Sequence, residues 1–147
     1  MTERPEIAEL VPHAGPMLLL ERLLEAGDDY AVCEVLVRSD GLFDSDGRVP
    51  AWLGIEYMAQ TVAAFSGLQA RRHQEPVKLG FLLGSRRFET NVQHFACGEV
   101  LRVTARRFVH DSSGMGAFEC EVHGDCAQQS ATLSVYQPPD ASDFVQA

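Results

Sequence analysis

One stretch of the sequence, residues 50–70, most constrains what this chain can fold into. It contains a single charged side chain, Glu56, among mostly apolar neighbours. A helix that is apolar on nearly every side must be enclosed by other elements. Pro50 suits the first helical turn, and Arg71 and Arg72 complement the negative pole of the macrodipole at the far end. The sequence therefore predicts a central helix roughly 30 Å long.

The segments that flank this helix have the alternation of apolar and polar residues that is typical of half-buried strands. No helical pattern separates the strands after it, so crossover helices for a parallel sheet are not expected. We expect an α+β chain with an antiparallel sheet wrapped around one helix. It forms a single domain over 1–138, followed by a flexible tail at 139–147. The predicted strands are 17–24, 31–37, 79–89, 99–110, 116–123 and 127–136.

Charge and hydropathy exclude several function classes. A net charge of -9 argues against wholesale nucleic-acid binding, which needs a dominant basic surface. The N-terminal residues lack a basic segment followed by an apolar one, and no apolar run reaches the roughly 18 to 20 residues of a membrane span, so we expect a cytoplasmic protein. The sheet covers the helix only partly, which favours a dimer.

The cysteines and the loops give no sign of a metal or cofactor. Four cysteines, at positions 33, 97, 120 and 126, form no CxxC pair, and buried free thiols are the expected state. The five histidines share no metal-ligand spacing. Phosphate-loop, dinucleotide and nucleophile-elbow motifs are all missing from the sequence. We therefore expect no cofactor and no metal.

Basic residues concentrate in the second half of an otherwise acidic chain. Eight of the twelve lie between Arg71 and Arg107. An acidic partner could dock there, although an ordinary solvated surface would have the same composition. The docking candidates are Arg71, Arg72, Arg86 and Arg87.

Glu56 is the strongest candidate for chemistry. Burying a lone carboxylate is costly unless it is paired or protonated, and burial prepares a carboxyl group for acid-base work near neutral pH. The alternative is a structural glutamate bonded to buried partners. Gln60, one turn later, faces the same way and either orients a substrate or is a satisfied core amide.

The helix start and the lead-in supply further candidates. Backbone N–H groups of Ala51 and Trp52 lack intrahelical partners there, so a thioester carbonyl would meet two donors and a positive dipole end. His13 lies in a rigid Pro- and Gly-containing loop. It either contacts substrate or is a structural histidine.

Two segments resemble the hotdog-fold 3-hydroxyacyl-(acyl carrier protein) dehydratases of fatty-acid synthesis. Residues 10–22, LVPHAGPMLLLER, are similar to that family's opening segment, and residues 50–60, PAWLGIEYMAQ, to its central helix. Residues 78–84 are similar to the strand that follows the helix. The variant that most resembles residues 49–60 is the dehydratase-like subunit of aryl polyene gene clusters.

The resemblance implies a hotdog fold and assigns roles by position. Glu56 matches the family's helix carboxylate and Ala51 its backbone donor, while Pro50, Trp52, Gln60 and Gly84 fall in matching substrate-binding segments. The chain departs from the family at residues 43–50, which are about four residues too short to hold its Gly-His-Phe-Pro-Gly catalytic loop.

These matches lead to three functional hypotheses. The first is a 3-hydroxyacyl thioester dehydratase, or the glutamate-donating subunit of one, in which the histidine base comes from a histidine-bearing hotdog partner or from His13. The second is a catalytically silent partner subunit. The third is a hotdog thioesterase in which Glu56 activates water and Gln60 holds the substrate. The substrate would be an acyl thioester of acyl carrier protein or coenzyme A.

Overall fold

A computed structural model describes residues 5–40, 42–76 and 80–138. A lead-in of two short 3-10 helices precedes the sheet, and one long α-helix interrupts it. In chain order the elements are η1 (Ile7–Glu9), η2 (Gly15–Met17), β1 (Arg22–Ala26), β2 (Tyr30–Leu36), β3 (Arg48–Pro50), α1 (Leu53–Arg72), β4 (Phe81–Thr90), β5 (His94–Ala96), β6 (Val100–His110), β7 (Met115–His123) and β8 (Gln128–Tyr136).

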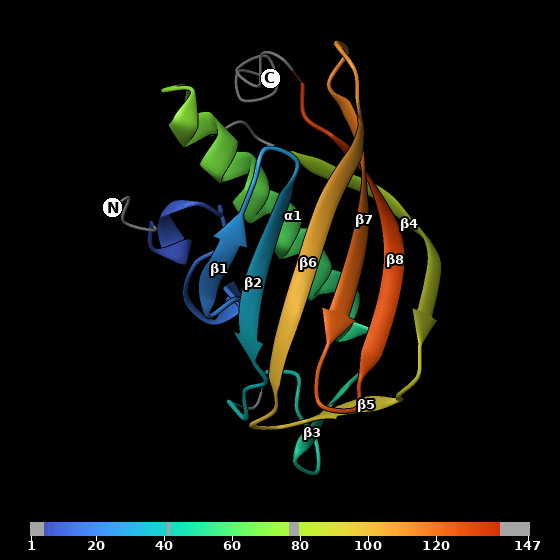
Figure 1. The fold of residues 1–147 in the computed structure, drawn as a ribbon. Helices are drawn as coiled ribbons and strands as arrows, with labels where there is room; N and C mark the ends of the chain where they lie inside the picture. Colours follow the sequence, from blue (N-terminus) through green and yellow to red (C-terminus); the bar gives the residue numbers. More distant parts are fainter. Residues whose placement is uncertain (1–4, 41, 77–79, 139–147) are drawn as a thin grey trace, which may run out of the picture.

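The six longer strands form one antiparallel sheet in the order β1-β2-β6-β7-β8-β4. In Figure 1 the sheet curves across the view and α1 runs diagonally behind it. The lead-in lies beside β1 at one side of the helix, and β4 forms the opposite edge of the sheet. The predicted α+β architecture, a sheet wrapped around one helix, is confirmed.

The core lies between α1 and the inner face of the sheet. Phe65 of α1 meets Phe118 of β7 edge to face, with ring centroids 5.6 Å apart. Burying a side chain of this kind contributes about 1.5–3 kcal/mol. On the helix's other side, Gly67 lets the lead-in approach, because a Cβ there would collide with the backbone of Leu10. The core is therefore continuous from the lead-in to β7.

Two sequence-based boundaries are wrong. Pro50 ends β3, opposite His94 of β5, instead of opening the helix, which begins at Leu53. The predicted strand over 17–24 begins only at Arg22, because the buried amide of Gln60 accepts a hydrogen bond from the Leu19 N–H. The same amide donates to the Met17 carbonyl, so these backbone groups serve the helix and not a ladder.

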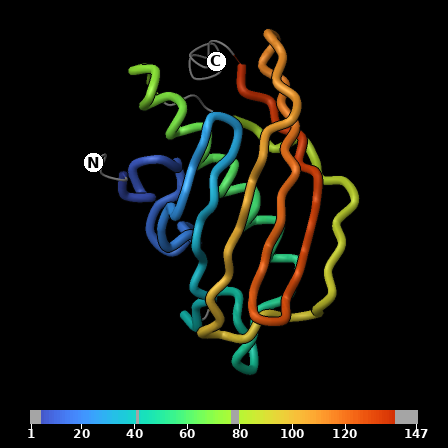
Figure 2. The backbone as a smooth tube through the Cα atoms, in the orientation of Figure 1, coloured from blue at the N-terminus to red at the C-terminus, as the bar shows by residue number. Residues whose placement is uncertain are grey.

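The edge strand β4 is exposed along almost its whole length. Its apolar residues Phe81, Leu82 and Leu83 are 37%, 46% and 56% exposed. Figure 2 shows the β6–β7 hairpin projecting beyond the neighbouring strands at one end of the sheet. No helix in the described ranges is long and apolar enough to cross a membrane.

Candidate active site

Glu56 stands in the first turn of α1, at the beginning of the helix face that continues with Ala59, Ala63 and Ser66. Residues at this spacing lie above one another on a helix. The carboxylate is less enclosed than the sequence predicts, since 36% of the side chain is exposed in the single chain.

His13 is a titratable neighbour of Glu56. Its Nε2 atom lies 3.5 Å from the Glu56 Oε1 atom. Its Nδ1 atom is buried and has no hydrogen-bond partner among the described residues. The loop turns back toward the helix at Gly15, whose φ of 59° is accessible mainly to glycine. The lead-in thus positions an imidazole against the helix carboxylate within one chain.

Gln60 hydrogen-bonds both to Glu56 and to the backbone of the lead-in that carries His13. Its Nε2 donates to Glu56 Oε1 at 3.0 Å and to the Met17 carbonyl at 2.8 Å. Its Oε1 accepts from the Leu19 N–H at 2.9 Å. The side chain is fully buried, and both of its N–H donors are used within the chain. Gln60 therefore positions Glu56 and the lead-in, which matches the satisfied-amide alternative.

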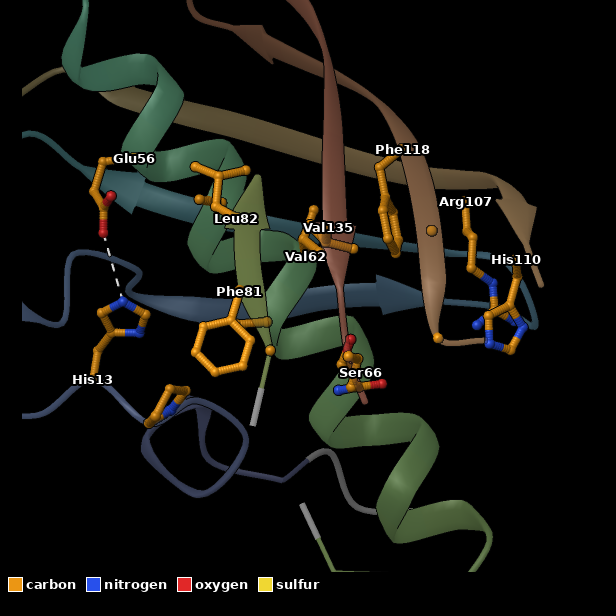
Figure 3. A pocket seen from close by; sticks show the side chains of 17 residues that line it. His13, Glu56, Val62, Ser66, Phe81, Leu82, Arg107, His110, Phe118 and Val135 are labelled. Atoms are coloured by element: carbon orange, nitrogen blue, oxygen red, sulfur yellow. Dashed lines mark ion pairs between the residues drawn. The ribbon is translucent and has the colours of Figure 1, made fainter. Parts of the chain in front are cut away.

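A cavity of about 280 Å³ extends from the His13–Glu56 pair along α1. Figure 3 shows the pair at one side of this cavity and Arg107 with His110 at the other, with apolar side chains between them. Only His13 and Glu56 of the predicted site residues line it. The apolar walls come from α1, β4, β7 and β8, chiefly Val62, Phe81, Leu82, Phe118 and Val135. Such a space fits a hydrocarbon chain with its polar end at Glu56.

The predicted helix-start donors are arranged differently from the expectation. The Ala51 N–H donates to the Gln93 carbonyl at 2.9 Å, so it is not a free donor in this chain. Trp52 is 59% exposed and meets Phe43 edge to face outside the cavity. Pro50 and Gly84 also lie outside the cavity lining. The segment after the helix contributes Gly80, Phe81 and Leu82 instead of Gly84.

Sequence reasoning missed most of the cavity wall, including Arg107 and His110. The alternating pattern of 116–123 marked Phe118 as buried, which was the available signal for this wall. No periodic signal marked Arg107, because it lies on β6 next to Arg106 and a register shift between Arg107 and Val109 interrupts the alternation.

The four docking arginines fall in two separate places. Arg71 and Arg72 end α1, where Arg71 pairs with Glu9 at 3.4 Å and Arg72 donates to the Gly27 carbonyl. Arg86 and Arg87 lie on the exposed edge strand β4. Figure 1 places the end of α1 and β4 on different sides of the molecule. The four side chains therefore form two surfaces and not one patch.

The cysteines are all free, and they differ in exposure. Burial raises the pKa of Cys33 and of Cys120 to about 12, which keeps both thiols protonated and inert. Cys97 is half-buried and Cys126 is exposed, so the expectation of buried thiols is wrong for these two. In the described part of the chain no three His, Cys, Asp or Glu side chains are placed to hold a metal ion.

The model of the ApeP-like family, described as ApeP dehydratase, matches residues 5–146. The chain belongs to the ApeP-like dehydratase family. It is thus a hydro-lyase-family protein with a hotdog fold. This dehydratase is also 32% identical to the 3-hydroxyacyl-(acyl-carrier-protein) dehydratase FabZ of Streptococcus equi subsp. zooepidemicus strain MGCS10565, over 91% of this chain and 96% of the relative.

Solved structures agree with this assignment. This chain superposes on a chain of the dehydratase heterocomplex ApeI:P from Xenorhabdus doucetiae with a TM-score of 0.87 and 30% identity, covering 98% of this chain and 97% of that chain. A hypothetical thioesterase from Streptococcus pneumoniae TIGR4, solved with coenzyme A, matches with a TM-score of 0.60 and 13% identity over 79% of this chain and 86% of that one. The second likeness shows the fold alone.

Proposed function

We propose that this chain removes water from 3-hydroxyacyl thioesters of acyl carrier protein and that Glu56 donates the proton to the departing hydroxyl. The observation that carries the proposal is the Glu56 carboxyl group at the polar end of an apolar cavity, held by Gln60 and 3.5 Å from His13. The family membership and the FabZ relatives support the reaction class.

The reaction requires two proton transfers on neighbouring carbons. A base removes a proton from C2, the C2–C3 double bond forms, and the C3–O bond breaks as an acid protonates the hydroxyl, which leaves as water. Glu56 must enter this step protonated, and it leaves ionised. Transfer of a proton from the protonated base back to Glu56 restores both groups to their starting states. Gln60 serves as a positioning residue, because its amide fixes the Glu56 oxygen.

A histidine on a second hotdog subunit is the proposed base. Residues 43–50 are too short for the family's histidine loop, while Glu56 is retained. The exposed strand β4 contributes Phe81 and Leu82 to the cavity wall, so a subunit that paired with this edge would also enclose the site. The matched structure ApeI:P is described as a dehydratase heterocomplex, which supports a site that involves a second, different subunit.

A second candidate is favoured by the His13 geometry. In this version the chain carries both groups, with His13 as the base and Glu56 as the acid. The contact between His13 Nε2 and Glu56 Oε1 places the two groups close enough to act on adjacent carbons of one substrate. It predicts activity without any other subunit.

The carrier protein would dock through arginines. Acyl carrier proteins are acidic partners, and exposed Arg86 and Arg87 on β4 lie on the strand that also lines the cavity. We place docking there in preference to Arg71 and Arg72, which already contact Glu9 and Gly27. The cytoplasmic location expected from the sequence belongs to this proposal and rests on the FabZ relatives.

Mass spectrometry of a 3-hydroxyacyl carrier protein tests the proposal. The carrier is incubated with this chain, with a histidine-bearing hotdog subunit, and with both. Loss of roughly 18 mass units, one water, is expected when both subunits are present. Activity of this chain without the other subunit, abolished by His13→Gln, would support the His13 version instead.

The same spectra discriminate the remaining alternatives. Release of the free carrier thiol would identify a thioesterase and contradict the proposal. A rate that depends on this chain but is unaffected by Glu56→Gln would indicate a silent subunit. His123 and Glu121 form a similar pair at 3.1 Å outside the cavity, so His123→Gln and Glu121→Gln are matched controls.

A further inference from the structure

The cavity has a second polar end, which the proposed dehydration does not use. Arg107 and His110 line it at the side opposite His13 and Glu56, and Ser66 of α1 lies near them (Figure 3). Glu56 and Ser66 occupy one face of α1, separated by about 15 Å along the helix axis at 1.5 Å per residue. The two ends are therefore joined by a channel of chain-like dimensions.

The middle of this channel suits hydrocarbon and not the prosthetic arm of a carrier protein. Its side chains are apolar and include Val62, Phe81, Leu82, Phe118 and Val135. The two amides of a pantetheine arm would lose their water here without gaining side-chain partners, which costs free energy. An acyl chain whose C3 hydroxyl is at Glu56 would therefore extend toward Arg107.

The group at the end of that acyl chain then meets a cation. The Arg107 guanidinium lies over the Phe65 ring, 5.0 Å from its centroid. The N–H groups of a guanidinium lie in its own plane, so a guanidinium stacked over a ring can still donate hydrogen bonds to an acceptor beside the ring. A methyl terminus would desolvate these donors without replacing the lost hydrogen bonds. An oxygen at the same place would accept them.

The surroundings of Arg107 keep this end polar. An adjoining pocket of about 170 Å³ shares Ser66, Arg107, His110 and Gln137 with the cavity and also includes His73 and Glu75. The turn of the β6–β7 hairpin packs closely against the chain that follows β8, since a Cβ at Gly114 would collide with the Gln137 backbone. The fold therefore supports a defined polar end beside the turn of that hairpin, where β6 ends at His110.

We infer that Arg107 and His110 make this end of the cavity selective for acyl chains that terminate in a hydrogen-bond-accepting oxygen, such as a hydroxyl or carboxylate, over chains that terminate in methyl. The inference rests on the proposed function for the direction in which the substrate lies. Arg107 is the main specificity-determining residue, because it can donate two hydrogen bonds from one fork.

A binding experiment separates this inference from the dehydration chemistry. Saturated acyl-pantetheine thioesters of roughly fourteen carbons, long enough to run from Glu56 past Ser66, carry no 3-hydroxyl group and do not dehydrate. Three versions end in methyl, hydroxyl or carboxylate, and a fourth is the methyl-ended phosphopantetheine thioester. Calorimetry with the full chain, and with the chain bound to its partner subunit, gives the dissociation constants.

The wild-type chain is expected to bind at least one oxygen-ended thioester about tenfold or more tightly than the methyl-ended one, as a hydrogen bond to a charged group predicts. Arg107→Met retains an aliphatic side chain, removes the guanidinium that lies over Phe65, and is expected to remove the preference. Arg107→Lys, which retains charge without the fork, is expected to keep part of it. Arg106→Met is the matched control, because the neighbouring Arg106 pairs with Asp29 at 3.3 Å outside the cavity.

Several results would overturn the inference. Equal affinities of the wild-type chain for the methyl-ended and oxygen-ended thioesters would overturn it even if Arg107→Met failed to fold. A preference for oxygen-ended thioesters that persists in folded Arg107→Met would also overturn it. A loss in that variant confined to the phosphopantetheine thioester would show that Arg107 binds the phosphate of the arm. Dehydration of 3-hydroxyacyl carrier protein would persist in each of these cases if the proposed function holds.

Discussion

At the scale of single residues, the site depends on one buried amide as much as on the carboxylate. Gln60 bonds to Glu56, Met17 and Leu19 and so connects the helix to the lead-in that bears His13. The sequence indicated that Glu56 and Gln60 share a helix face. It did not indicate the backbone partners, because residues 10–20 follow no period from which their position could be derived.

Replacing Gln60 tests its positioning role. Gln60→Leu leaves the Leu19 N–H buried without its acceptor, so the free energy of unfolding should fall by about 2–3 kcal/mol in a denaturant titration. Dehydration should slow through kcat more than through KM, since Glu56 loses its support. Gln69→Leu is the control on the same helix, because that amide makes longer bonds of 3.3 and 3.4 Å. An equal loss of kcat in both variants would contradict the positioning role.

The cysteines give a second prediction at this scale. A water-soluble disulfide reagent at neutral pH should label Cys126 quickly and half-buried Cys97 slowly. Cys33 and Cys120 should react only on unfolding, because burial raises the pKa of both thiols to about 12. Peptide mapping after timed quenching measures this order. Rapid labelling of Cys33 in the folded chain would show that the core beside α1 is open.

At the scale of elements, periodicity determines what could be predicted. The helix and the strands after it follow periods of 3.6 and 2 over many residues, and their ranges agree with the sequence to within a few positions. The strands β3 and β5 were missed because three residues are too few to show a period. For the same reason Pro50 was assigned to the helix, although it closes β3 beside the helix start.

The edge strand β4 carries a prediction about association. Leu83 is 56% exposed on this edge, so Leu83→Glu should leave the free energy of unfolding of the single chain nearly unchanged. It should weaken subunit association, because a carboxylate would be desolvated in the paired edge. Sedimentation at several concentrations measures the change. Leu36→Glu, at a residue 40% exposed on β2, is the control, and equal effects of both substitutions would exclude β4 as the interface.

At the scale of the whole molecule, the single chain leaves one side of the proposed site open. Glu56 is 36% exposed, and the cavity wall includes residues of β4, which pairs with β8 on one side and is the edge of the sheet on the other. In the proposed complex, a second hotdog subunit covers both and supplies the histidine that residues 43–50 are too short to contain. The sequence did not predict the partial exposure of Glu56, and the proposed complex accounts for it, because its site is enclosed by two chains.

The single-turnover rate of water loss from a 3-hydroxyacyl carrier protein, followed by mass spectrometry in the complete two-subunit complex, tests the proposed role of Glu56 most directly. Glu56→Gln is expected to lower this rate by about a hundredfold or more, the scale of one general acid. Glu121→Gln, which removes the exposed carboxylate paired with His123, should leave it unchanged. A Glu56→Gln complex that still loses water at the wild-type rate would rule out Glu56 as the general acid.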